Sequence, residues 1–283
     1  MHNSFATSLS IRVAEGHVRL YTDVPAARDH FSSVFSLCRC VGRPKGPLLS
    51  EYGIFFQGRN EVVAWCSYPD SNGSDRETLY AGSSTSAVWV VDHEMIKRTV
   101  LRDSDCAALH AAWVSTGNAI LILAGDGGSG KSSLCLELLL LGCGYGAEDV
   151  TFFQGPNPLA LPRAVLLKPG SALRSRSGLI RLPSVLEDFD GRAYCLPQPP
   201  PKVARYDQQQ FVFMFLEAAG SGTLSRLGPT ETVRRFVEAC QTPNKISPLL
   251  FERVVKTARE GRSYVVRGRL VPAVHQAIKD VAA

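Results

Sequence analysis

The ten residues AGDGGSGKSS, from Ala124 to Ser133, constrain the fold of this chain more than any other stretch. They follow the aliphatic run AILIL and precede the leucine-rich run LCLELLLL, so we expect them to join a buried strand to a buried helix. The glycines fit two phosphate-binding patterns. From Gly125 to Gly130 they match G-x-G-x-x-G, which is typical of dinucleotide sites. From Gly125 to Ser132 they match G-x-x-x-x-G-K-S, which is typical of nucleoside triphosphate sites.

The triphosphate pattern explains more of these residues. A triphosphate requires converging backbone N–H groups, a helix N-terminus, a lysine, and a hydroxyl that can ligate the accompanying magnesium ion. Lys131 and Ser132 supply the last two, and the dinucleotide pattern requires neither. Glu148 favours the dinucleotide alternative, because it lies about twenty residues further on, where a ribose-binding acid is expected. That acid should end its strand, however, and VTFF continues the strand-like run after Asp149.

We therefore predict a site for ATP and Mg²⁺ in this stretch. The predicted nucleotide-binding residues are consecutive: Gly125, Asp126, Gly127, Gly128, Ser129, Gly130, Lys131, Ser132 and Ser133.

Two adjacent acids, Glu148 and Asp149, follow the leucine-rich helix in the strand-like run YGAEDVTFF. Successive side chains of a strand point to opposite faces. One carboxylate can therefore approach the metal ion while the other points toward a substrate hydroxyl, and we predict such a division of roles.

The order of these features resembles the catalytic core of the HPr serine kinases and their relatives. That core combines a histidine in a strand, a glycine loop ending in Gly-Lys-Ser, a leucine-rich helix, a glycine and an Asp-Asp pair. In this chain His110, the loop that ends in Lys131–Ser132, Gly142 and the pair Glu148–Asp149 occupy these places. The resemblance covers residues 109–153 well and the later strands loosely. It implies the nucleotide fold that these kinases share with the ATP-dependent phosphoenolpyruvate carboxykinases.

The resemblance also implies a role for each matching residue. Lys131 would hold the β- and γ-phosphates, and Ser132 would ligate magnesium with help from Asp149. Glu148 would take the place of the aspartate that removes the proton of the substrate hydroxyl. His110 would lie near the transferred phosphoryl group.

The chain departs from the family in three ways. Glu148 is one methylene longer than the family aspartate, Ser133 stands where the bacterial HPr enzymes usually have an acid, and their downstream glycine-rich segment is not found. Similar kinases of ribosomal-peptide clusters, including lasso-peptide clusters, phosphorylate a terminal serine. The resemblance thus implies transfer of the ATP γ-phosphoryl group to a serine of a peptide or protein. A kinase for a sugar or amino acid and an ATP-dependent regulatory module without transfer activity are the alternatives.

Outside the resemblance, the pattern of the chain predicts a mixed α/β fold with a small β-rich domain over residues 1–86 and a kinase domain over residues 87–283. Alternating segments such as SLSIRVA and EVVAWCSY indicate strands before Ser86. Helical spacing predicts a helix over 87–102, and QFVFMFLEA predicts a central strand. Past one strand end, Lys168 and either Arg174 or Arg176 are candidates to neutralise phosphate charge.

Composition limits the other classes of function. The 283 residues contain 31 Lys and Arg against 26 Asp and Glu, and no basic run is interleaved with aromatics, so nucleic acid is not an expected partner. The longest apolar runs are too short to cross a bilayer, and the N-terminus lacks the features of a secretory signal. The eight cysteines are scattered, which does not indicate a disulfide framework. We expect a soluble, cytoplasmic protein without a membrane partner, and a homo-oligomer remains open.

Overall fold

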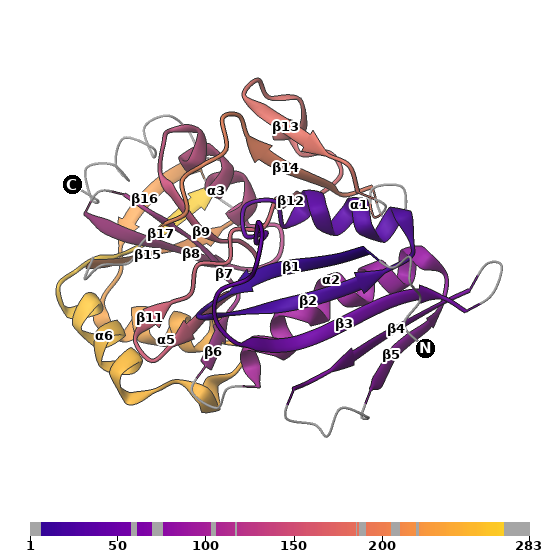
Figure 1. Ribbon diagram of the computed structural model, residues 1–283. Helices are drawn as coiled ribbons and strands as arrows, with labels where there is room; N and C mark the ends of the chain where they lie inside the picture. Colours follow the sequence, from indigo (N-terminus) through magenta and orange to yellow (C-terminus); the bar gives the residue numbers. More distant parts are fainter. Residues whose placement is uncertain are drawn as a thin grey trace. The chain divides into compact units, whose positions relative to one another are not determined.

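The computed structural model describes residues 7–57, 61–69, 76–102, 106–116, 118–184, 186, 191–204, 210–218 and 221–268. The protein is α/β with mixed sheets, as expected (Figure 1). The chain divides into two compact units. Unit 1 contains Met1–Arg102 and Arg163–Leu196, and unit 2 contains Asp103–Pro162 and Pro197–Ala283. The helix expected over VPAVHQAIKDVA lies outside the described residues.

Unit 1 is built on a five-stranded sheet in the order β1-β2-β3-β4-β5. Its elements are β1 (Thr7–Val13), β2 (Gly16–Thr22), α1 (Pro25–Val34), β3 (Leu48–Phe56), β4 (Val62–Ser67), β5 (Glu77–Gly82) and α2 (Ser84–Leu101). The strands β2 and β3 are parallel and joined through α1, whereas the other neighbouring pairs are antiparallel.

The two faces of this sheet differ in polarity. On β3, Tyr52 donates a hydrogen bond of 3.1 Å to Met95 O of α2, and the hydroxyls of Ser50 and Thr99 are 2.7 Å apart. Helix α2 therefore packs on the face to which Ser50 and Tyr52 point. Along β1, Leu9 is buried and its neighbour Ser8 is exposed, so β1 shows the alternation of a half-buried strand.

After the glycine-rich loop, the stretch Arg163–Leu196 belongs again to unit 1. Its residues form a three-stranded sheet in the order β12-β14-β13. Its elements are β12 (Val165–Leu167), the 3₁₀ helix η1 (Ala172–Ser175), β13 (Leu179–Leu182) and β14 (Ala193–Pro197). The division thus differs from the predicted boundary after residue 86. Helix α2 belongs to unit 1, and so does a second stretch of chain that a boundary drawn along the sequence cannot include.

Unit 2 contains a six-stranded sheet in the order β16-β17-β15-β8-β7-β9. Its elements are β7 (Ala111–Ser115), β8 (Ala119–Gly125), α3 (Lys131–Leu140), β9 (Gly144–Ala147), β15 (Gln210–Glu217), β16 (Ser221–Arg226), α5 (Pro229–Ala239), η2 (Pro243–Lys245), α6 (Pro248–Arg259) and β17 (Ser263–Gly268). The segment QFVFMFLEA forms β15, which lies between β8 and β17 and is parallel to both, so the expectation of a central strand is confirmed.

A second, smaller sheet continues from one side of the six-stranded sheet. It has the order β11-β10-β6, formed by β6 (Cys106–Leu109), β10 (Thr151–Gln154) and β11 (Asn157–Pro158). The strands β7 and β9 pair within the large sheet, and their continuations β6 and β10 pair within the small one. The segments β6–β7 and β9–β10 therefore form a two-stranded ribbon that passes from one sheet to the other. The break between β6 and β7 lies beside the break between β9 and β10.

Candidate functional site

The glycine-rich loop, residues 126–130, joins β8 to α3 in unit 2. Gly125 has a φ of +148°, and a Cβ atom there would lie 2.4 Å from Leu216 O of the neighbouring strand β15. Gly128 and Gly130 have φ values of +87° and +100°. Positive φ strains any residue with a Cβ atom, so the sequence needs glycine at these three positions to form the turn.

The loop has the features of an anion-binding cradle. Cβ atoms added to Gly127, Gly128 or Gly130 would meet nothing within 4 Å, so the backbone is open to an incoming group. The first N–H groups of α3 have no acceptor within the helix, and they carry the positive end of its dipole. Within the described part of the chain, the Ser129 hydroxyl is buried and has no hydrogen-bond partner. These groups fit the phosphates of a nucleotide.

Lys131 is the first residue of α3, and its side chain lies over the loop. Only 7% of the residue is exposed, and Nζ donates hydrogen bonds to Gly125 O at 2.6 Å and to Asp126 O at 2.9 Å. The loop backbone therefore holds the ammonium group at the place where the predicted phosphates would bind.

Ser132 and Glu148 are in direct contact. The hydroxyl of Ser132 donates a hydrogen bond of 2.6 Å to Glu148 Oε1, and Glu148 is only 6% exposed. Cys135, three residues after Ser132, has a pKa well above its ordinary value because it is buried and because the negative charge of Glu148 is close. Of the two adjacent acids, it is therefore Glu148 that approaches the start of α3.

The predicted strand through both acids is wrong. Strand β9 ends at Ala147 and β10 begins at Thr151, and the residues between them form a turn. Asp149 has a φ of +68°, which a strand does not allow, and Val150 N–H donates a hydrogen bond of 2.8 Å to Glu148 O. The turn, rather than alternation along a strand, separates the two carboxylates.

His110 occupies the matching break in the other strand of the ribbon. The sequence places it inside a strand, but it lies between β6 and β7, where its backbone N–H donates 2.9 Å to Ala239 O. Its Nε2 lies 3.7 Å from Asp149 Oδ1. The side chains of His110 and Asp149 are 36% and 49% exposed, so this pair is accessible from solvent, in contrast to Glu148.

The end of the large sheet at which β8 leads into the glycine-rich loop also carries a charged cluster. The sequence patterns did not indicate this cluster. Glu217, the last residue of β15, follows Leu216, which pairs in register with Gly125. Its carboxylate accepts 2.6 Å from Arg235 of α5 and 2.9 Å from Arg267 of β17. These hydrogen bonds lower the pKa of Glu217. The position of Glu217 at the end of a central parallel strand was the available signal, since ligands often bind at such ends.

The cations predicted to neutralise phosphate charge belong to unit 1. Lys168 and Arg176 are exposed, and Arg174 donates a hydrogen bond of 2.9 Å to Gly191 O. All three lie in the stretch Arg163–Leu196, whereas the glycine-rich loop lies in unit 2. Their role at the phosphate therefore stays a prediction.

No family model and no curated protein matches this chain. Among the residues that the structure describes, no group of three or more His, Cys, Asp or Glu side chains could hold a metal ion. None of the helices within the described ranges is long and apolar enough to cross a membrane. None of the eight cysteines, all of which lie within the described residues, forms a disulfide bond.

Proposed function

We propose that the protein is an ATP-dependent phosphotransferase that transfers the γ-phosphoryl group to the serine hydroxyl of a peptide or protein. We further propose that unit 2 is a P-loop core of the kind found in the HPr serine kinases. The observation that carries the proposal is the 2.6 Å hydrogen bond between Ser132 and Glu148. It joins the start of the helix after the glycine-rich loop to an acid pair whose second member lies beside His110.

The loop supports a triphosphate better than a dinucleotide pyrophosphate. Lys131 adds a full positive charge to the backbone N–H groups, and it is held against Gly125 and Asp126. Mg²⁺ in proteins is bound through one or two carboxylates together with substrate phosphates. Ser132 and Glu148 would hold it here, and the ion would neutralise charge on the phosphates when bound.

The geometry supports a different division of roles between the two acids from the one that the sequence predicts. The resemblance assigns the metal to Asp149 and the proton transfer to Glu148. Glu148, however, is buried and bonded to Ser132, whereas Asp149 is half exposed on the far side of a turn. We assign Glu148 to the metal and Asp149 to the acceptor hydroxyl.

In this reaction Asp149 takes the proton of the acceptor hydroxyl as that oxygen bonds to the γ-phosphorus. The bond from the γ-phosphorus to the β–γ bridging oxygen breaks, and ADP leaves. His110, with Nε2 3.7 Å from Asp149 Oδ1, orients the carboxylate and faces the transferred group. Lys131 stabilises the charge that develops on the phosphates.

The accessibility of Asp149 and His110 supports a large acceptor. Side chains that are 49% and 36% exposed can meet a serine on a peptide without the chain first opening. A kinase for a small metabolite usually encloses its substrate in a concave pocket. We therefore place the peptide acceptor ahead of a sugar or an amino acid.

Ligand-dependent melting and phosphate transfer test this function. Mg-ATP should raise the melting temperature more than NAD or NADP does, because at equal concentration the ligand that binds the folded state more tightly stabilises it more. With γ-labelled ATP, serine-containing peptides from a library should become labelled, and the same peptides with alanine in place of serine should not. Stabilisation by NAD alone, or an absence of labelled peptides, would contradict the proposal.

A further inference from the structure

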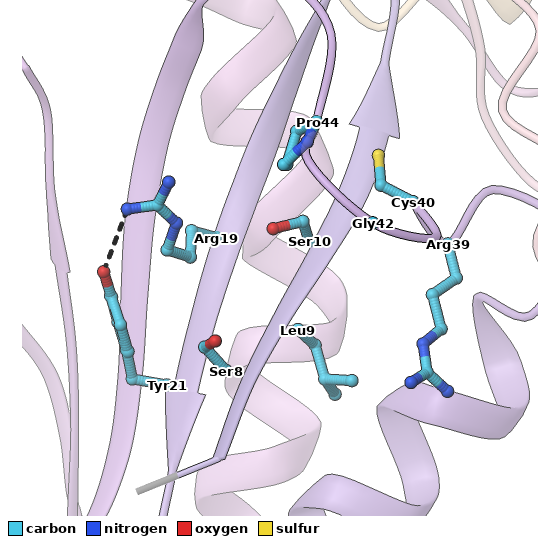
Figure 2. A pocket seen from close by; sticks show the side chains of 9 residues that line it. All are labelled: Ser8, Leu9, Ser10, Arg19, Tyr21, Arg39, Cys40, Gly42 and Pro44. Atoms are coloured by element: carbon cyan, nitrogen blue, oxygen red, sulfur yellow. Dashed lines mark hydrogen bonds between the residues drawn. The ribbon is translucent and has the colours of Figure 1, made fainter. Parts of the chain in front are cut away.

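Unit 1 contains a polar recess on the open face of its five-stranded sheet. The recess has a volume of about 330 Å³ and lies over β1 and β2. Ser8 and Ser10 form its floor (Figure 2). Figure 2 shows Arg19 and Tyr21 on the side of β2 and Arg39 on the opposite side of β1. This face is opposite to the one that α2 covers, because Arg19 is paired in register with Glu51, whose neighbours Ser50 and Tyr52 point toward α2.

The charge of the recess is positive. Arg19 donates 3.2 Å to the Tyr21 hydroxyl and lies 3.5 Å from Glu51, so its charge is partly balanced. Arg39 is exposed, and none of the described carboxylates forms an ion pair with it. The segment RCVGRPK, residues 39–45, contains three cations and no acid. An anionic group is therefore the expected occupant.

Backbone groups at the edge of β1 adjoin this charge. Arg12 N–H donates a hydrogen bond of 2.7 Å to Cys38 O, and Cys40 N–H donates one of 2.8 Å to Ser10 O. The short stretch 38–40 therefore pairs with the edge of β1 at Ser10 and Arg12. After Cys40 that chain turns away, with Val41 97% exposed and Gly42 at a φ of +80°. The pairing stops before Ser8.

Alternation along β1 determines where the backbone of Ser8 points. Residues two apart on a strand direct their N–H and C=O groups to the same side. The groups of Ser10 and Arg12 point outward to Cys38 and Cys40, so those of Ser8 also point outward. Among the described residues, nothing pairs with Ser8 on this side, and an added strand can extend the existing pairing there.

We propose that an extended, acidic segment of the peptide or protein substrate binds along this edge of β1 and directs carboxylates to Arg39 and Arg19. In an added strand every second side chain points to the same face, so alternating acids reach the recess while the backbone bonds to Ser8. A free phosphate or a single carboxylate would use the arginines but not the strand edge. The identity of the segment as substrate rests on the proposed kinase function, whereas its binding to this edge does not.

Fluorescence anisotropy with the full chain tests this surface. The probe is a labelled octapeptide of alternating Glu and Thr, with the corresponding Lys/Thr and Gln/Thr peptides for comparison. The Glu/Thr peptide should bind best, and its binding should weaken as salt rises from about 50 to about 300 mM. Arg39→Glu should weaken binding by at least about tenfold, because it reverses the charge that the peptide meets.

Two further variants separate the charge from the strand edge. Ser8→Pro removes the outward N–H without removing a pairing bond to β2, and it should weaken binding about fivefold. Lys97→Glu makes the same charge change as Arg39→Glu at an exposed position of α2, on the other face of the sheet, and should leave binding unchanged. Melting temperatures identify any variant that fails to fold. The amide of Ser8 should also become protected from hydrogen exchange when the peptide binds to the unaltered protein.

The outcomes are distinct from those of the kinase test. Equal binding by the unaltered protein, Arg39→Glu and Ser8→Pro would overturn the surface. The surface would also be overturned if inorganic phosphate displaced the peptide and the bound peptide did not protect the Ser8 amide from hydrogen exchange. That result would indicate a site for small anions. Lys131→Ala should keep peptide binding, since Lys131 lies in the other unit. Peptide binding together with an inactive unaltered enzyme would therefore contradict the kinase function and leave the binding surface intact.

Discussion

The hydroxyl of Tyr194 donates a hydrogen bond of 2.7 Å to Asp92 Oδ2, and this bond joins β14 to α2 within unit 1. Asp92 is only 1% exposed. Arg163 Nη1 lies 3.6 Å from the same oxygen, and His30 Nε2 of α1 lies 3.5 Å from Oδ1. One buried carboxylate thus connects the stretch after residue 163 to the two helices that precede the glycine-rich loop.

Replacing Asp92 with Asn should destabilise unit 1. Asn keeps the volume but removes the negative charge that compensates Arg163, and loss of one partner of a buried pair costs about 3 kcal/mol or more. Urea unfolding, monitored by tryptophan fluorescence, measures the change in the free energy of unfolding. Asp29→Asn is the control, because Asp29 is exposed and, within the part of the chain that the structure describes, forms its ion pair with the adjacent residue Arg28. Equal midpoints for the two variants would show that the buried network contributes nothing specific.

The same carboxylate should make stability dependent on pH. Burial raises the pKa of Asp92, but the charge of Arg163, the nearby imidazole of His30 and the hydrogen bond from Tyr194 outweigh it and hold the pKa below its ordinary value. A depressed pKa contributes stability that is present above the unfolded value of about 4 and is lost as pH falls below it. The stability difference between the unaltered protein and Asp92→Asn should therefore narrow as pH falls from about 5 to about 3. A constant difference over that range would contradict this linkage.

Lys131→Ala should weaken ATP binding and slow transfer by at least about 100-fold, because it removes the full positive charge that the loop holds against Gly125 and Asp126. Calorimetry with Mg-ATP and a transfer assay measure the two effects. Lys256→Ala, at an exposed position of α6, provides a lysine substitution away from the loop and should behave as the unaltered protein does. Near-normal transfer by Lys131→Ala would exclude the loop as the phosphate site.

The part of the fold that the sequence predicts best is local. The strand, glycine loop and helix around Lys131 follow from a short apolar run, three glycines with required positive φ, and a second apolar run. The strand breaks at His110 and Asp149 were not predicted, because strand-like apolar residues lie on both sides of each break. Each break is fixed by pairing between distant strands, β6 with β10 and β7 with β9. The stretch Arg163–Leu196 likewise meets α2 through contacts distant in sequence, those of Asp92 with Arg163 and Tyr194.

The candidate site was predictable to a similar extent. The motif identified Lys131, Ser132 and the acid pair, but the turn at Asp149 decides which acid meets Ser132. Glu217 was not identified because its partners Arg235 and Arg267 come from separate elements, and only the order of the parallel strands brings them together. Contacts of this kind depend on topology, and no spacing in the sequence encodes them.

The roles of the two acids can be separated by a pair of isosteric variants. Asp149→Asn removes the proposed proton acceptor and should lower turnover by about 10²- to 10⁴-fold. The magnesium concentration needed for half-maximal rate should stay nearly constant, because Ser132 and Glu148 are intact. Glu148→Gln should instead raise that magnesium concentration and weaken Mg-ATP binding, since an amide oxygen is a poorer ligand than a carboxylate.

A third substitution tests whether proton transfer belongs to Asp149 itself or to the Asp149–His110 pair. His110→Gln keeps a hydrogen-bonding side chain beside Asp149 Oδ1 but cannot carry a charge. If His110 only orients the carboxylate, this variant should slow turnover less than Asp149→Asn does and leave the magnesium requirement unchanged. Turnover should be measured in single-turnover experiments, so that product release does not conceal the chemical step. A large loss with Glu148→Gln at saturating magnesium, together with a raised magnesium requirement for Asp149→Asn, would reverse the assignment and restore the roles that the sequence resemblance implies.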